Sequence, residues 1–313
     1  MDGGEGGVPQ PTLGSCAGYE VRSSNVGFRT LRSGGGEPML VHGGDDPQIG
    51  GEVVATWRPR PGNPFHGRLL QDGGIFHFWA SDVGWYTIDA QHRTITISGD
   101  VDMLQTELRL FGIPAAICAF ESGDAPLHAS AIEIDGQAII LAGPSRQGKT
   151  TLAAAFAAHG HRLLSEDTTR CVPGRVPSAF PGPAVVRLRS DVAGLLDIPT
   201  ATALPTSFED GRTAFLFDDA SRGSGAALPL RAILMLRPGE GPPTLRSVDS
   251  ARAARDLFSL AFRLPTDASR AACFARVVDL AGRVEVMDLH RPITIDSLPS
   301  VISLVERHLE GGA

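Results

Sequence analysis

A stretch near the middle of the chain, from Gly143 to Thr151, constrains the fold more than any other feature. It begins Gly-Pro-Ser-Arg-Gln-Gly-Lys-Thr and fits the phosphate-binding pattern G-x-x-x-x-G-K-[ST]. The apolar run Ala138–Ala142 before it predicts a buried strand, and Thr150–His159 after it predicts a helix. Strand, glycine-rich loop and helix in this order predict an α/β fold that holds a nucleotide's phosphates on the loop.

Each part of this loop has a physical task in phosphate binding. Glycine lets the backbone wrap closely around phosphate oxygens, so that backbone N–H groups point inward, and the helix adds its positive N-terminal end. Lys149 is expected to reach the β- and γ-phosphates, and the Thr150 hydroxyl to ligate Mg²⁺. The predicted nucleotide contacts are Gly143, Pro144, Ser145, Arg146, Gln147, Gly148, Lys149, Thr150 and Thr151.

Lys149 is the only lysine in the chain. The other 27 of the chain's 28 lysine and arginine residues are arginine. Arginine can usually replace lysine on a solvated surface, but not where a compact ammonium must fit. The position of the one lysine therefore favours a phosphate site over the alternative, an ordinary glycine turn before a helix.

Charge and composition argue against several classes of protein. The net charge is −7 with a pI near 5.7, which argues against a broad grip on nucleic acid. No apolar run is long enough to span a membrane, and the first residues lack the basic and apolar segments of a signal peptide, so we expect a cytoplasmic protein. The four cysteines are scattered and suggest neither a zinc site nor a disulfide framework.

Turn and strand signals divide the chain into three parts. Residues 1–16 are rich in Gly and Pro and predict a disordered tail. Residues 17–124 alternate like strands between glycine turns and then become helical over 102–120, with a break at Gly112–Pro114, which predicts a small β-rich α+β domain. Residues 125–313 contain the loop and predict a catalytic domain with a mixed sheet and helices.

Two carboxylates follow the next predicted strand, Arg162–Ser165, and a histidine precedes the loop. Glu166 and Asp167 lie where the end of a neighbouring strand would approach the loop, so one could hold Mg²⁺ and the other could accept a proton. The alternative is a solvated acidic pair that caps a loop. On its own, a histidine in a strand, such as His128, more often packs in the core or lies on the surface than takes part in catalysis.

These residues together resemble the catalytic domain of the HPr kinase/phosphorylase family. The resemblance rests on Leu127–Ser130, the loop with its preceding strand, and Gly160–Asp167. It implies ATP and Mg²⁺ as cofactors, Glu166 as the proton acceptor, Asp167 as its acidic metal-side partner and His128 as an active residue beside the phosphates. Glu166 stands where the family has Asp, and the family's later Glu-x-Arg-Gly-x-Gly signature is missing, which argues against the sugar-transport carrier protein as substrate.

The chain is more similar still to a divergent branch, the lasso-peptide tailoring kinases. This similarity rests on a β-rich N-terminal part with a Trp-Tyr strand and on Pro183–Arg189. It implies phosphoryl transfer to the C-terminal serine of a precursor peptide. Arg187 and Arg189 are then candidate clamps for phosphate or carboxylate, or else mark a solvated strand edge. Asp191 is the only candidate for a second metal ligand.

The leading hypothesis is therefore a serine kinase that acts on a peptide or protein, without nucleic acid or membrane as partner. A P-loop ATPase or nucleotide-binding regulatory module is the second class, and a small-molecule kinase the third. A serine kinase of the HPr type with another carrier as substrate stays open, as does a homo-oligomer.

Overall fold

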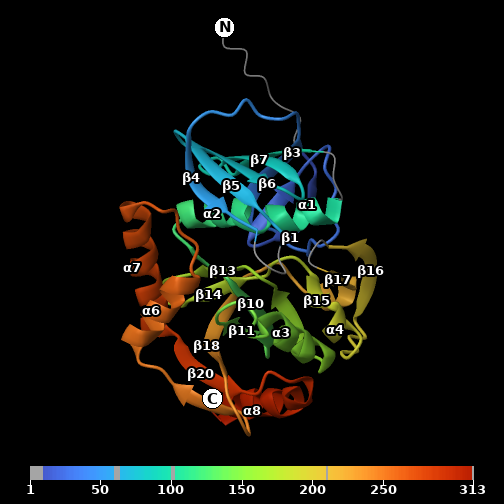
Figure 1. The fold of residues 1–313 in the computed structure, drawn as a ribbon, viewed down its shortest axis with the longest axis vertical. Coiled ribbons are helices and arrows are strands. Elements are labelled where there is room, and N and C mark those ends of the chain that lie inside the picture. Colours follow the sequence, from blue (N-terminus) through green and yellow to red (C-terminus); the bar gives the residue numbers. More distant parts are fainter. Residues whose placement is uncertain (1–9, 60–63, 100–102, 209–210, 312–313) are drawn as a thin grey trace.

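The computed structural model describes residues 10–59, 64–99, 103–208 and 211–311, and Figure 1 shows one sheet above the other. The upper sheet has eight strands in the order β1-β2-β3-β8-β7-β6-β5-β4. They are β1 (Thr12–Cys16), β2 (Tyr19–Arg22), β3 (Glu37–Gly43), β4 (Glu52–Trp57), β5 (Gly67–Asp72), β6 (Ile75–Ala80), β7 (Gly84–Asp89) and β8 (Thr94–Ser98). Side chains alternate across each strand, so that Phe76 and Phe78 point into one apolar core with Tyr86 and Ile88.

Helices α1 (Met103–Leu110) and α2 (Ile113–Glu121) cover the lower face of this sheet (Figure 1). The predicted break between them is confirmed: Gly112 precedes α2 and Pro114 stands in its first turn, where no backbone N–H is needed. Residue 102, where we expected the helix to begin, lies outside the described residues.

The prediction of a disordered tail over residues 1–16 is wrong in its last part. Thr12–Cys16 forms β1, which pairs antiparallel with β2, and Ser15 and Cys16 are fully buried. Pairing and burial here depend on Tyr19–Arg22 and on Arg32, so the local composition alone did not reveal them. Residues 1–9 of the predicted tail lie outside the described residues.

The lower sheet has nine strands and is mixed, as predicted for the α/β part of the chain. Its main path is β12-β10-β11-β18-β14-β13-β9, with β20 on β18 and β19 on β20. β11 is parallel to β18, and β18 to β20, whereas β10 is antiparallel to both β11 and β12. The strands are β9 (Ala125–Leu127), β10 (Ala129–Ile134), β11 (Gln137–Ala142), β12 (Arg162–Ser165), β13 (Thr169–Val172), β14 (Ser178–Phe180), β18 (Leu228–Pro238), β19 (Thr244–Ser247) and β20 (Glu285–Arg291).

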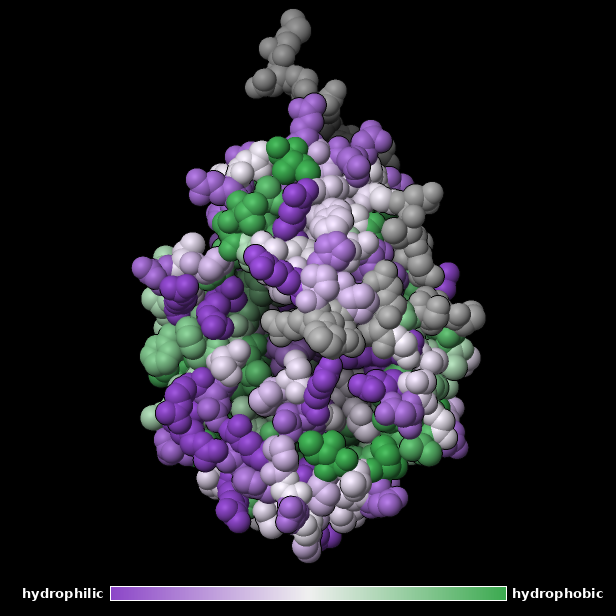
Figure 2. Space-filling view, viewed as in Figure 1, coloured by the Kyte–Doolittle hydropathy of each residue, from purple (hydrophilic) through white to green (hydrophobic). Residues whose placement is uncertain are grey.

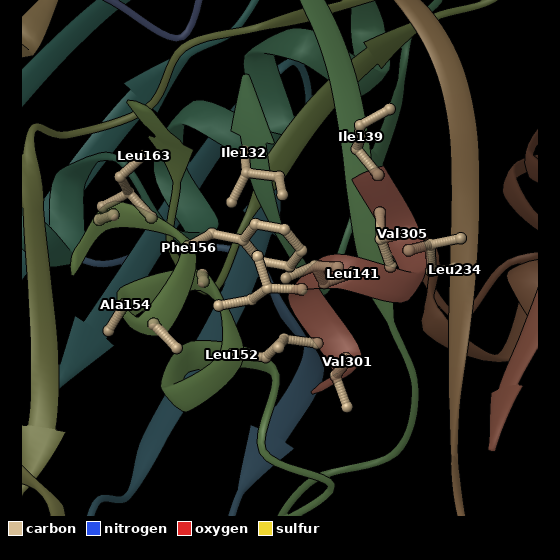
Figure 3. Close-up of a cluster of buried hydrophobic side chains, with 14 of the residues drawn as sticks. Ile132, Ile139, Leu141, Leu152, Ala154, Phe156, Leu163, Leu234, Val301 and Val305 are labelled. Carbon is tan, nitrogen blue, oxygen red and sulfur yellow. The ribbon is translucent and has the colours of Figure 1, made fainter. Parts of the chain in front are cut away.

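Helices pack on both faces of the lower sheet. One face carries α3 (Lys149–Ala158) and α8 (Leu298–Gly311), and the other carries α6 (Ser250–Leu260) and α7 (Asp267–Arg283). Figure 3 shows Phe156 of α3 and Val305 of α8 beside Ile139 and Leu141 of β11. β11, the strand that leads into the phosphate-binding loop, is therefore buried from both sides.

A third, small sheet lies beside α3, in the order β15-β17-β16. It consists of β15 (Val185–Arg189), β16 (Ala201–Ser207) and β17 (Arg212–Phe217), and short helical segments α4 (Ser190–Ala193), α5 (Asp219–Arg222) and η1 (Ile295–Ser297) complete the fold. Across the described part of the chain, no helix has both the length and the apolar composition needed to cross a membrane.

Arg32, between β2 and β3, joins the upper part of the chain to the lower sheet. Its side chain is buried, and it donates hydrogen bonds of 2.9 Å from Nε to Gly182 O and of 3.0 Å from Nη2 to the carbonyl oxygens of Leu163 and Leu164. Burial lowers the pKa of this guanidinium to about 10, which still leaves it charged at neutral pH. One buried cation thus satisfies carbonyl groups at the end of β12.

We expect Arg32→Ala to lower the free energy of unfolding by at least about 2 kcal/mol, because it leaves several buried carbonyl oxygens without their donor. Arg22→Ala is the matched control: its guanidinium is partly exposed and pairs only with the nearby Glu20, so its loss should cost less than about 0.5 kcal/mol. Urea unfolding of both variants measures the difference. Equal midpoints would show that Arg32 does not hold the two parts together.

Candidate active site

The phosphate-binding loop begins at the carboxyl end of β11 and ends at the first turn of α3. Gly148 precedes the helix with a φ of 75°, a left-handed conformation that favours glycine, and a Cβ there would lie 2.6 Å from Nη2 of Arg291. Lys149 is the first residue of α3 and is buried, which lowers the pKa of its ammonium. Its Nζ donates to Gly143 O at 2.9 Å and to Pro144 O at 3.2 Å, so the loop wraps around its own cation.

A buried arginine supports this loop from behind. Arg291, the last residue of β20, is 3% exposed, and its Nη2 donates to Gln147 O at 2.9 Å and to Gly148 O at 3.4 Å. Burial lowers the pKa of its guanidinium, and its Nε has no hydrogen-bond partner among the described residues. The side chain therefore tethers the loop's carbonyl groups, which leaves the N–H sides of these peptides free to turn toward a ligand.

Sheet topology brings Glu166 and Asp167 to the same edge as the loop. β10 is antiparallel to both β11 and β12, so these two strands run in the same direction and their carboxyl ends meet at one edge. A tight turn then separates the two side chains: Asp167 has a φ of 68°, and Thr168 N donates to Glu166 O at 2.7 Å. As a result, the side chain of Glu166 is 4% exposed and that of Asp167 is 50% exposed.

Strand pairing also explains the position of His128. Leu127 lies opposite Thr169 in the antiparallel pair of β9 and β13, so the next residue, His128, lies near Asp167. His128 Nδ1 is 2.9 Å from Asp167 O, a pure acceptor, and therefore carries the proton; it is 3.4 Å from Asp167 Oδ1. Its Nε2 faces Lys149 Nζ at 3.5 Å. His128 thus links the loop to the carboxylate pair.

Two arginines of the small third sheet face the carboxylates. Arg187 on β15 donates from Nε to Glu166 Oε2 at 3.0 Å and from Nη2 to Asp167 Oδ2 at 3.4 Å. Nη1 of Arg212, on β17, lies 3.8 Å from Glu166 Oε1. Of the two arginines singled out from the sequence, Arg187 therefore contacts both carboxylates. Arg189 lines the same cavity but is mostly exposed, and its Nε pairs with Asp191 Oδ1 at 3.3 Å.

The pKa values of the two adjacent carboxylates are shifted in opposite directions. Burial raises the pKa of Glu166, and the charge of Asp167 adds to this, although Arg187 opposes it. Desolvation also acts to raise the pKa of Asp167, but His128, Arg187, Arg212 and Lys149 together hold it at about 2. When the surroundings of two carboxylates push their pKa values apart, the one with the raised pKa can exchange a proton and the other stays charged.

A large cavity of about 1450 Å³ opens over these residues. It is lined by Lys149, Asp167, His128 and Arg187 and continues past Thr151 on one side and the Leu260–Leu264 segment on the other. The remaining predicted loop contacts on its lining are Ser145, Arg146, Gly148 and Thr150.

Glu166 borders a separate void of about 30 Å³ instead, which it shares with Asp167 and Arg187. Its Oε1 is buried and has no hydrogen-bond partner among the described residues. Nη1 of Arg212 lies 3.8 Å from this oxygen, beyond hydrogen-bond distance. A volume of this size holds about one water-sized group, so Oε1 can still accept a hydrogen bond from a hydroxyl that reaches it.

The residues present fit a magnesium ion bound together with a nucleotide. Magnesium usually takes one or two carboxylates and keeps waters and phosphate oxygens as its other ligands, rather than a cage of protein groups. Asp167, ionised and half exposed, and the hydroxyl of Thr150, at the start of α3, supply such a set. Within the described ranges no cluster of three or more His, Cys, Asp or Glu residues is arranged for a metal, so a site made by protein ligands alone is not indicated there.

No family model matches the chain, and no curated protein matches it. Among solved structures, the chain is similar to the structure of the HPr(Ser) kinase/phosphatase from Coxiella burnetii, with 13% sequence identity. The superposition covers 60% of this chain and 99% of that chain, with a TM-score of 0.31. A likeness at this level fixes neither activity nor substrate, so both rest on the site itself.

Sequence reasoning missed Arg212 and Arg291. Arg212 is brought to Glu166 by the pairing of β15 with β17, and Arg291 reaches the loop across 144 positions of sequence. Neither stands in a motif, and in a chain with 27 arginines no local signal separates them from the rest.

We expect Lys149→Ala to lower phosphoryl turnover by at least about 10²-fold, the scale of losing one preorganised charge, while circular dichroism stays unchanged. Lys149→Arg should fail as well, because a planar fork does not fit the space that the compact ammonium occupies between Gly143 and Pro144. Turnover of Mg·ATP is the measurement. Full activity in either variant would rule out this loop as the phosphate site.

We expect Arg291→Ala to weaken Mg·ATP binding about tenfold, because the carbonyl groups of Gln147 and Gly148 lose their buried donor and the loop loosens. Arg246→Ala, at an exposed position on β19, is the matched control and should bind like the wild type. Titration calorimetry compares the two. Unchanged affinity in Arg291→Ala would mean that the loop keeps its shape without this tether.

Proposed function

We propose that this protein is a Mg²⁺-dependent ATP kinase that transfers the γ-phosphoryl group to a serine hydroxyl of a peptide or protein. The observation that carries the proposal is the convergence of Lys149, His128, Asp167 and Glu166 at the loop, with Arg187 between the two carboxylates. A nucleotide-binding switch needs the loop and a metal-side carboxylate, but it does not need a second carboxylate with a raised pKa and a free oxygen.

The chemistry divides among these residues as follows. The backbone of the loop and Lys149 hold the β- and γ-phosphates, and Mg²⁺, held by Thr150 and Asp167, supplies charge neutralisation when bound. Glu166 accepts the proton of the attacking hydroxyl through Oε1, and Arg187 holds its other oxygen in place. His128 keeps Asp167 oriented through its carbonyl oxygen and faces Lys149 with Nε2.

The acceptor we favour is the C-terminal serine of a lasso-type precursor peptide, in the cytoplasm. This choice rests on the resemblance of the sequence motifs. The cavity of about 1450 Å³ has room for an acceptor beside the nucleotide. A small-molecule kinase stays an alternative. A P-loop ATPase or regulatory module, and an HPr-type kinase with another carrier, are the alternatives that the assay below separates.

We expect Glu166→Gln to keep Mg·ATP affinity but to lose phosphoryl transfer to a serine peptide by about 10²–10⁴-fold. Asp167→Asn should instead weaken Mg·ATP binding, because it removes a metal-side charge. In the wild type, the transfer rate should fall as the pH falls through the raised pKa of Glu166, since only the ionised carboxylate accepts a proton. The midpoint should therefore lie above the ordinary glutamate value of about 4.3, and this limb should vanish in Glu166→Gln.

The assay follows transfer of labelled γ-phosphate to serine peptides with and without EDTA, and Mg·ATP affinity by calorimetry. Wild-type transfer by Glu166→Gln would exclude Glu166 as the base. If only Asp167→Asn loses transfer and it binds Mg·ATP normally, the two carboxylates have exchanged roles. Mg·ATP hydrolysis without transfer to any serine peptide or protein would favour the ATPase alternative.

A further inference from the structure

The cavity over the loop does not end at the phosphate site; it continues into an apolar hollow under the upper sheet. This hollow is lined by Val54, Ala55, Trp57, Phe65, Phe78 and Ile113. β4 supplies one wall and the junction of α1 with α2 supplies the other. Figure 2 shows hydrophobic atoms gathered on the left of this face, above and below the level where the two halves of the molecule meet.

The walls of the hollow are held in place by aromatic contacts. The ring of Trp57 packs edge-on against Phe78, with centroids 5.6 Å apart, and the guanidinium of Arg109 lies 4.0 Å from the centroid of Phe65. Arg109 is itself fixed by Asp82, to which its Nη2 donates at 2.6 Å. A hollow lined by fixed aromatic rings excludes water and favours an apolar occupant.

Backbone contacts connect this hollow to the reacting end of the cavity. His128 N donates to Leu260 O at 2.8 Å, and Phe262 N donates to Pro126 O at 2.8 Å. The segment Leu260–Leu264 therefore forms a continuous wall from His128 to the hollow, along the one cavity that both share.

The wall formed by β4 also suggests an extended chain as the occupant. β4 is the last strand of the upper sheet and pairs only with β5 among the described strands (Figure 1). The four successive residues 54–57 all line the cavity, so the cavity follows β4 over most of its length. The register of β4 with β5 shifts between Val53 and Ala55, which interrupts the alternation of side chains there and helps to turn neighbouring residues toward the cavity. Exposed strand edges bind extended peptides through backbone hydrogen bonds, with pockets for alternate side chains.

The charge of the cavity fits an anionic chain. Its described lining contains eight arginines and Lys149 but only two carboxylates, Asp167 and Asp191, in a chain whose net charge is −7. Arg109, Arg187, Arg189 and Arg270 pair with carboxylates, namely Asp82, Glu166, Asp167, Asp191 and Asp267. The cations of the lining still outnumber these carboxylates, which favours an acceptor with acidic residues.

We propose that this hollow is the specificity pocket for the acceptor: it takes one aromatic or large aliphatic side chain of an extended, acidic peptide, with β4 as the strand on which the peptide lies. The inference rests on the proposed kinase function. It adds that the serine and the apolar side chain must be a fixed number of residues apart, because one cavity of fixed shape holds both.

The test uses the full chain with Mg·ATP and a library of serine peptides rich in Asp and Gly, in which one Phe, Leu or Asn is moved along the positions beside the serine. We expect Phe and Leu at one fixed offset to raise kcat/KM about tenfold to a hundredfold over Asn, the scale of burying such a side chain. Trp57→Ser should abolish this preference, and Trp57→Phe should retain most of it.

Trp79→Ser is the matched control, because Trp79 lies on the opposite face of the same sheet, against Arg68 and Trp85, and should keep the wild-type preference. Mg·ATP affinity, measured in every variant, separates a lost pocket from a lost fold. Transfer without any offset preference, or a preference that Trp57→Ser retains, would overturn the pocket while the kinase function stands. No transfer to any peptide, despite Mg·ATP turnover, would overturn both.

Sedimentation velocity adds an independent outcome. If the wild type is a dimer and Trp57→Ser a monomer, a second copy of the chain fills the hollow and the proposal is wrong.

Discussion

The burial of β11 on both faces is the constraint on which the site depends. Ile139 and Leu141 pack beneath α3 and α8 (Figure 3). Ile140 packs on the side of α6 and α7. A strand held from both sides cannot slide or tilt, and the same apolar cluster holds α3, so both ends of the phosphate-binding loop are fixed before any ligand arrives. Fixed backbone dipoles need no rearrangement when charge develops, and this preorganisation is the main source of electrostatic catalysis. The loop's chemistry thus depends on apolar packing several residues away from it.

The two neighbouring carboxylates acquire different properties because one turn sends them into different surroundings. Asp167 adopts a positive φ, which turns its side chain toward the cavity and its carbonyl oxygen toward His128, whereas Glu166 points back toward Arg187. Burial then raises the pKa of Glu166, and His128 together with Arg187, Arg212 and Lys149 lowers that of Asp167. An adjacent pair on a straight strand would also diverge, but it would not place both carboxylates within reach of one guanidinium. The left-handed conformation of Asp167, which costs on the order of 1 kcal/mol, is therefore what brings both carboxylates to Arg187.

The local half of this site can be predicted from the sequence, and the long-range half cannot. The loop, its flanking strand and helix, and the pair Glu166–Asp167 lie in one short stretch whose pattern is set by backbone geometry. Arg212, Arg291 and Trp57 reach the cavity only through sheet pairing and the packing of distant segments, so no spacing rule marks them. Helix α7 is a different case: Thr266 caps its N-terminus by accepting a hydrogen bond from Ser269 N, and this signal is local in the sequence. Strand β1 was predicted to be disordered because glycine and proline are frequent around it. It forms only because it pairs with β2, which the local composition does not show.

Buried cations, together with apolar contacts, set the relation between the phosphate end of the cavity and its apolar end. Arg32 binds carbonyl groups at the end of β12, and Arg170 donates to Asp124 and to Ala17 O while it stacks on Tyr19. Such groups lose hydration on burial, and their hydrogen bonds offset that cost, so removing one of them leaves its partners buried and unpaired. Each is satisfied in only one arrangement of the two sheets. The hydrophobic effect is non-directional, so directional hydrogen bonds from buried guanidinium groups add to apolar packing in fixing how the two sheets are placed. The cavity between Lys149 and Trp57 therefore has a fixed length, and it accepts a chain only when the reacting and anchoring groups of that chain are the right distance apart.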